Sequence, residues 1–149
     1  MTVISTEDFL DVGRTDVSDA SISVKTQGQT TLLTVTGVID GSNSDFMNTV
    51  LRGFTGRSAS VVVDVSGSGL FGAQSLRALM DSDRRCRRDG VPFVVVASSA
   101  QQSLIRRLDP SGGIRTASSV ARAVELGEHR IAARSIASSP RVDPAKLRC

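Results

Sequence analysis

Two short runs of almost uninterrupted apolar residues most constrain the fold of this 149-residue chain. Residues 60–65 read Ser-Val-Val-Val-Asp-Val, and residues 92–97 read Pro-Phe-Val-Val-Val-Ala. Runs this short and this rich in β-branched residues are typical of strands that are covered on both faces of a sheet. Each run is followed by a stretch with apolar residues at helical spacing. The sequence therefore predicts strands that alternate with helices around a largely parallel sheet.

The remaining elements complete a small α/β domain. Alternating apolar and polar residues around Gly28 predict an N-terminal hairpin, and Pro110 and the glycines after it predict the end of a helix. The predicted strands are residues 21–26, 31–40, 60–65, 92–97 and 114–116, and the predicted helices are residues 45–54, 73–89, 101–108 and a stretch after Ser118. We thus expect a mixed, mostly parallel sheet of about five strands with about four helices.

A chain of this length fits one domain, and composition indicates where that domain ends. Residues 1–20 carry five acidic side chains around a short apolar pair, which predicts an extension loosely attached to the fold. Residues 134–149 contain two prolines and scattered serines, which predicts a flexible tail. The expected domain therefore spans residues 21–133.

Composition argues against several classes of function. The chain has no Trp or Tyr to stack on nucleic-acid bases, and its net charge is only +3, so we expect no direct nucleic-acid partner. Cys86, Cys149 and the single histidine His129 lack the spacing of a metal or Cys/His catalytic site, so we expect neither a metal nor an enzyme. No long apolar run or signal-peptide pattern occurs, so the expected location is the cytoplasm, without a membrane.

The stretch from Gly67 to Gly72 reads G-x-G-x-x-G, as in a dinucleotide-binding loop. Asp64 lies three residues before Gly67 and would place a negative charge close to the phosphates. The next strand runs into Ser98 without an acidic residue that could hold a ribose. We therefore predict no cofactor, and a small-ligand or nucleotide-binding module using the Gly67–Gly72 loop stays as the alternative.

Residues 61–79 resemble the signature segment of the STAS domain, the fold of bacterial anti-sigma factor antagonists. Asp64, Val65 and Ser66 match an Asp-apolar-Ser pattern after the apolar strand, and Leu70 and Phe71 match the two apolar residues that follow. Further matches are Gly37-Val-Ile-Asp40 at the end of the hairpin, and the segments Ile105–Leu108 and Gly113-Ile114. The resemblance extends from about residue 21 to residue 132 and implies a STAS-like fold.

The sequence departs from this family at the centre of the switch. Where the family has Asp-Ser-Ser-Gly, this chain has Gly72-Ala73-Gln74-Ser75, and the phosphorylated serine of the family falls on Ala73. The resemblance implies a non-enzymatic protein that binds an anti-sigma factor of the histidine-kinase-like ATPase fold and controls sigma-factor-dependent transcription, as in bacterial stress responses. Because alanine cannot accept a phosphoryl group, the simplest hypothesis is a constitutively active antagonist.

The resemblance also indicates which residues would contact the partner. The expected contacts are Asp40, Ser42, Asn43, Gly72, Ala73, Gln74, Ser75 and Leu76. For Asp40, capping of the turn before the next helix is an equal alternative. A STAS-type scaffold that assembles with its own kind is a further alternative to antagonist function, and the expected state is a monomer or a weak dimer.

Several nearby residues admit a structural or a functional interpretation. Ser66, Ser68 and Ser75 could accept a phosphoryl group in place of the lost site, although turn and capping hydrogen bonds also explain serines here. Asp64 is interpreted as holding the loop through its carboxylate. Cys86 is expected in the core, and the arginines of residues 84–88 are interpreted as a solvated helix end.

Overall fold

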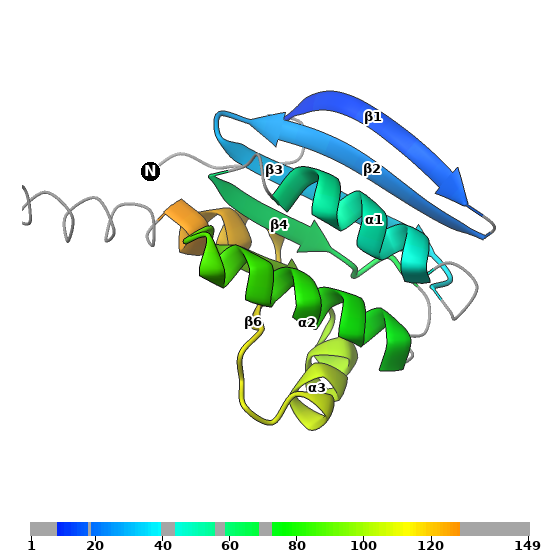
Figure 1. Ribbon diagram of the computed structural model, residues 1–149, viewed down its shortest axis with the longest axis vertical. Coiled ribbons are helices and arrows are strands. Elements are labelled where there is room, and N and C mark those ends of the chain that lie inside the picture. The colour runs from blue at the N-terminus through cyan, green and yellow to red at the C-terminus, as the bar shows by residue number, and fades with distance from the viewer. Residues whose placement is uncertain (1–8, 18, 40–43, 56–58, 69–72, 129–149) are drawn as a thin grey trace, which may run out of the picture.

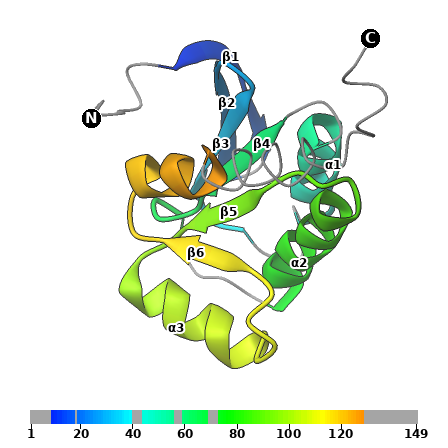
Figure 2. The ribbon, with the colours of Figure 1, turned by 90° about the vertical axis from the view of Figure 1, so that its left-hand side faces the viewer.

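The computed structural model describes residues 9–17, 19–39, 44–55, 59–68 and 73–128. Within them, one six-stranded sheet has its strands in the same spatial order as in the chain, from β1 to β6 (Figures 1 and 2). The strands are β1 Leu10–Val17, β2 Ala20–Gln27, β3 Thr30–Gly37, β4 Ser60–Asp64, β5 Phe93–Val96 and β6 Arg115–Ala117. The labelled helices are α1 Ser44–Thr55, α2 Ala73–Arg88 and α3 Ser99–Leu108, and a further helix occupies residues 120–128.

The sheet is mixed, as predicted. Strands β1, β2 and β3 form an antiparallel meander, whereas β3 to β6 run parallel to one another. The turn between β2 and β3 contains Gly28 at φ 59°, a left-handed conformation that glycine adopts without a Cβ penalty. The mixed α/β sheet expected from the sequence is therefore confirmed.

The sequential strand order decides where the helices lie. Three successive parallel connections that all step in the same direction, and are all right-handed, must place their helices on the same face of the sheet. Residues of α1, α2 and α3 accordingly share one core, whereas the helix of residues 120–128 covers the opposite face (Figure 2). Helices α1 and α2 pack side by side over the parallel strands (Figure 1).

Strand β4 shows how one apolar run serves both cores. Val61 and Val63 pack in the larger core with residues of α1 and α2, and Val62 packs in the smaller core with Val124. All three valines of β4 are fully buried. The prediction that this run is covered on both faces is confirmed, and Cys86 lies in the larger core as expected.

The N-terminal region differs from the expectation. Residues 10–17, assigned from the sequence to a loose extension, form β1 and pair antiparallel with β2, which raises the strand count from about five to six. Phe9 is only 6% exposed and packs in the smaller core, so the domain begins before residue 21. Strand β1 carries no burial signal, because its side chains at positions 10–16 are exposed and an irregularity between Asp11 and Gly13 interrupts the alternation.

The expected tail at residues 134–149 and the expected domain end at residue 133 lie outside the described residues, as do His129 and Cys149. None of the helices in the described part of the chain is both long and apolar enough to cross a membrane.

Candidate functional site

The loop that leaves β4 is held by the carboxylate of Asp64, the last residue of that strand. Asp64 Oδ1 accepts a hydrogen bond from the backbone N–H of Ser66 at 3.0 Å and from the Ser66 hydroxyl at 2.6 Å. An aspartate that accepts from the residue two positions ahead forms a local turn without help from any other element. The interpretation of Asp64 as the residue that holds this loop is therefore confirmed.

The carbonyl of Val65 is the second fixed point of the loop. It accepts from the backbone N–H of Ser68 at 3.0 Å and from the Ser68 hydroxyl at 2.6 Å. It also accepts from the side-chain amide Nε2 of Gln101 on α3 at 3.0 Å. Three donors from two elements therefore converge on one carbonyl oxygen, which fixes the path of the chain from β4 towards α2.

Gln101 is a functional-site residue that the sequence analysis did not identify. Its Oε1 accepts from the backbone N–H of Ser98 at 2.9 Å, and its own N–H donates to the Ser98 hydroxyl at 3.2 Å, which together form a capping box at the start of α3. The Ser-x-x-Gln spacing was visible in the sequence as a helix-start signal. The additional bond to Val65 was not, because it depends on the packing of α3 beside the loop.

These bonds also bear on the alternative that the Gly67–Gly72 loop binds the phosphates of a nucleotide, as far as residues 67 and 68 are concerned. The backbone N–H of Val65 donates to the Val96 carbonyl, and those of Ser66 and Ser68 donate within the loop. A phosphate cradle needs backbone N–H groups that are free to bind the anion. Gly67 does not adopt a positive φ, and a Cβ at this position would lie 3.4 Å from Cγ2 of Thr36.

Gly37 fixes the neighbouring loop, which leads from β3 towards α1. Its φ is 86°, and a Cβ at this position would lie 1.9 Å from the backbone oxygen of Asp19. The same Asp19 oxygen accepts from the backbone N–H of Val38 at 3.2 Å, and Gly37 forms a parallel bridge with Ser68. Only glycine fits this approach, so Gly37 ties the ends of the two loops together.

The predicted contact residues fall into three groups. Asp40, Ser42, Asn43 and Gly72 lie outside the described residues. Ala73, Gln74 and Ser75 form the first turn of α2. Leu76 is only 3% exposed and packs in the larger core, so we assign its side chain to the core and not to a contact surface.

Two of the three candidate phosphosites, Ser66 and Ser68, already donate hydrogen bonds within the loop, and the third, Ser75, lies in the first turn of α2. The Ser66 hydroxyl lies against the Asp64 carboxylate, where an added phosphoryl group would meet a like charge. The Ser68 hydroxyl donates to the Val65 carbonyl and is half-buried. Turn chemistry is thus sufficient to explain these two serines.

A cavity between α2 and α3 is lined by charged and apolar residues, the buried Leu76 among them. Leu76, Arg77, Met80, Asp81, Arg84 and Leu108 line a cavity of about 360 Å³ between α2 and α3. Leu108 is 44% exposed, as is Val38 beyond β3. Among the described residues, no three His, Cys, Asp or Glu side chains gather as metal ligands would.

A comparison with protein families matches residues 22–114 to a model described as the Mlab-type STAS domain. The matched segment begins in β2 and ends just before β6, so it contains both loops described above. No curated protein matches the chain by sequence.

Solved structures resemble the fold closely enough to compare topology. An anti-sigma factor antagonist from Mycobacterium paratuberculosis has a TM-score of 0.63 at 16% identity, covering 73% of this chain and 94% of its own. A variant of RsbS from Moorella thermoacetica has a TM-score of 0.61 at 19% identity, with coverage of 72% and 95%. The Bacillus cell fate determinant SpoIIAA in its phosphorylated form has a TM-score of 0.55 at 8% identity, with coverage of 70% and 96%. At these identities the likeness concerns the fold alone.

Proposed function

The chain belongs to the STAS domain family, and from this premise we propose that it is a non-enzymatic regulator that binds an anti-sigma factor. The partner is an anti-sigma factor of the histidine-kinase-like ATPase fold, and binding controls sigma-factor-dependent transcription in a bacterial cytoplasm. The observation that carries the proposal is the combination of Ala73 at the first position of α2 with a preceding loop fixed by Asp64 and Gln101.

A fixed loop favours binding because its conformation need not be ordered when the partner arrives. The Asp64 carboxylate and the Val65 carbonyl hold the chain that leaves β4, and the bridge between Gly37 and Ser68 ties it to the end of β3. The proposed contacts are Asp40, Ser42, Asn43, Gly72, Ala73, Gln74 and Ser75.

Ala73 determines how this surface is regulated. A phosphoryl group on a serine at this place would add a charge of about −1.5 to −2. The alanine methyl cannot accept it, so the contact surface keeps its charge whatever kinase is present. The protein therefore acts as an antagonist whose activity depends on its amount and not on phosphorylation at this residue.

The test is a calorimetric titration of the protein against the anti-sigma factors of the histidine-kinase-like ATPase fold from the source organism. Wild type should bind one of them without prior treatment, and Ala73→Glu should abolish binding because it imposes the missing negative charge. Ala73→Ser is the matched control, because it adds only a hydroxyl: it should bind as wild type does and then lose binding when ATP is added. Absence of binding to every such factor would falsify the proposal.

Phosphorylation of a different serine is tested by measuring the intact mass of the protein after incubation with ATP and the binding partner. Wild type should keep its mass, whereas Ala73→Ser should gain one phosphoryl group. A mass gain by wild type that disappears in Ser66→Ala, Ser68→Ala or Ser75→Ala would instead establish a relocated switch.

A STAS-type scaffold is a second candidate, favoured by one feature of the sheet edge. Strand β1 pairs only with β2 among the described elements, and its Leu10 and Val12 are 74% and 54% exposed. A free edge with apolar side chains is a known route to self-association. Sedimentation velocity would show a concentration-dependent dimer that Leu10→Lys weakens if scaffolding is the function.

A further inference from the structure

The opposite end of the α1–α2 layer carries a concentration of positive charge. Arg52 lies in the last turn of α1, and Arg85 and Arg88 lie in the last turn of α2. Both helices connect parallel neighbouring strands, so they run in the same direction and their C-terminal ends lie side by side. A cavity of about 440 Å³ is lined there by Arg52, Asp81, Arg84, Arg85 and Arg88, and we call it the arginine cavity.

The charge of the arginine cavity exceeds what the helix ends require. Four arginines and one aspartate give its lining a formal charge of +3. Two helix C-termini contribute about −0.5 each, which leaves roughly +2 without a counter-charge. Asp81 is already paired with Arg84 at 2.8 Å. Within the described residues, the side chains of Arg52 and Arg88 make no hydrogen bond or ion pair, so no described side chain neutralises this surplus charge.

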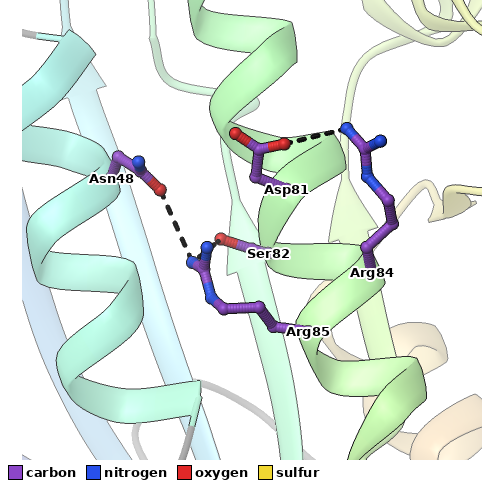
Figure 3. A network of polar contacts seen from close by, with 5 residues as sticks. All are labelled: Asn48, Asp81, Ser82, Arg84 and Arg85. Atoms are coloured by element: carbon purple, nitrogen blue, oxygen red, sulfur yellow. Dashed lines mark hydrogen bonds and ion pairs between the residues drawn. The ribbon is translucent and has the colours of Figure 1, made fainter.

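Arg85 is fixed in place between the two helices, pointing from α2 towards α1 (Figure 3). One guanidinium nitrogen, Nη2, donates to the Ser82 hydroxyl at 3.1 Å and contacts the Asn48 side-chain oxygen at 3.5 Å. Its Nε is buried and has no hydrogen-bond partner in the described part of the chain. Burial first, and the nearby Arg52 second, lower the pKa of Arg85 from its ordinary value.

The neighbouring Arg87 on the same helix, by contrast, is paired with other groups of the protein. Its Nε lies 3.1 Å from Asp83 Oδ2, and its Nη2 donates to the Gly113 carbonyl. Arg87 therefore fastens α2 to the segment before β6 and does not line the cavity. The arginines of residues 84–88 thus divide into one that stabilises the fold and three that line the cavity.

The lining also restricts the ligand. It contains no apolar side chain, so an apolar molecule has nothing to pack against, and its positive charge excludes a cation. Guanidinium groups present a planar set of donors that matches phosphate oxygens and binds them at two points. The volume of about 440 Å³ lies in the range of small-molecule sites.

We propose that the arginine cavity binds a phosphoryl group, carried by a small phosphorylated molecule or by a phospholipid headgroup. The site lies roughly 20 Å along α2 from Ala73, at about 1.5 Å per residue, and is therefore separate from the surface proposed to bind the anti-sigma factor. The proposal does not depend on that function.

The first experimental arm titrates inorganic pyrophosphate into the full chain at low ionic strength, followed by calorimetry. Wild type should show saturable binding to one site. Arg52→Gln and Arg88→Gln should each weaken binding by about tenfold or more, because each removes a charge-assisted contact. Arg107→Gln is the matched control, since it removes the same charge from an exposed position on α3 outside the cavity, and should change the affinity by less than about twofold.

The second arm distinguishes the two sources of the phosphoryl group by co-sedimentation with vesicles. Phosphatidylcholine vesicles with and without phosphatidic acid are compared for the same four proteins. Retention that requires phosphatidic acid and is lost in Arg52→Gln and Arg88→Gln identifies a headgroup as the source, whereas pyrophosphate binding without vesicle retention identifies a soluble ligand. The proposal is overturned if neither probe binds saturably, or if Arg107→Gln weakens binding as much as the two cavity variants do.

Discussion

In the described part of the loop before α2, the side chains of Asp64, Ser66 and Ser68 are paired within the protein, whereas the cavity at the end of α2 is lined by four arginines and one aspartate. The first region depends on geometry: the Asp64 carboxylate and the missing Cβ of Gly37 each permit contacts that few other residues could make. The second depends on charge, because Arg52 and Arg88 are exposed and have no partner among the described residues. Substitutions should therefore change the structure at the first region and ligand binding at the second.

The largest effect is expected at Gly37. Gly37→Ala places a Cβ against the Asp19 backbone oxygen and forces a positive φ on alanine, so the free energy of unfolding should fall by roughly 3 kcal/mol or more. Urea denaturation measures the change. Gly53→Ala in α1, next to Arg52, is the matched control: nothing lies within 4 Å of its new methyl group, and the protein should gain about 0.5–1 kcal/mol. Similar changes in the free energy of unfolding for both variants would contradict the view that geometry matters more at Gly37 than near the arginine cavity.

The second effect is a pH dependence of stability that comes from Cys86, which is buried in the larger core on the same helix as three of the cavity arginines. Burial, and then the charge of Asp83, raise the pKa of the Cys86 thiol from its ordinary 9.0 to about 12. Above pH 9 the unfolded chain therefore loses this proton while the folded protein keeps it, so stability falls as pH rises towards 12. Between about pH 8 and about pH 10.5, the free energy of unfolding should fall by about 2 kcal/mol, measured by urea denaturation.

Cys86→Ala is the control for this pH dependence, because it lacks the thiol and leaves the arginines in place. Its stability should be lower at neutral pH, since a buried side chain becomes smaller. Its decline over the same pH range should nevertheless be flatter than that of wild type. Parallel pH profiles would show that other groups cause the loss.

The next prediction concerns how much the Asp64 carboxylate stabilises the loop that leaves β4. Asp64→Ala removes the acceptor for both the backbone N–H and the hydroxyl of Ser66, which should lower the free energy of unfolding by about 1 kcal/mol at this half-buried position. Asp64→Asn keeps one acceptor oxygen and should lose less than half as much. Hydrogen exchange of the Ser66 amide should accelerate in Asp64→Ala, and unchanged exchange would contradict its role in holding the loop.

The smallest effect is expected at Arg88. Arg88→Gln loses a favourable charge at the C-terminus of α2 but also removes repulsion with Arg85, so stability should stay within about 0.5 kcal/mol of wild type. Thermal melts at low and high salt measure the balance. Salt should stabilise wild type slightly more than Arg88→Gln, since only wild type has the full set of like charges to screen. A large loss would mean that Arg88 supports the fold.

The central part of the fold could be predicted because its residues carry strong local signals. The valines of β4 and the helical spacing in α2 indicate burial directly, and Asp64 can form its turn with a residue two positions away. Strand β1 could not be predicted, since an exposed edge strand is stabilised by backbone pairing that leaves no mark on side-chain pattern.

Only part of the arginine cavity, the arginines of α2, could be predicted from the sequence. The sequence shows the arginines of α2 as a run, but Arg52 joins them from 32 positions or more away because parallel connections place α1 beside α2. The contact of Gln101 with Val65 was hidden in the same way. Contacts within a turn are readable from sequence, whereas contacts between elements require the order of the strands.

The strand order also affects how the chain can fold while it is being synthesised. Because β1 to β6 are neighbours in the order of synthesis, each new strand can join the growing edge of the sheet without being inserted between two that are already paired. The helix of residues 120–128, which covers the second face, follows all six strands in the chain, so the smaller core with Leu32, Val62 and Val94 stays open until that helix has been made. A stalled ribosome would hold a nascent chain with one face of the sheet sealed and the other exposed to chaperones.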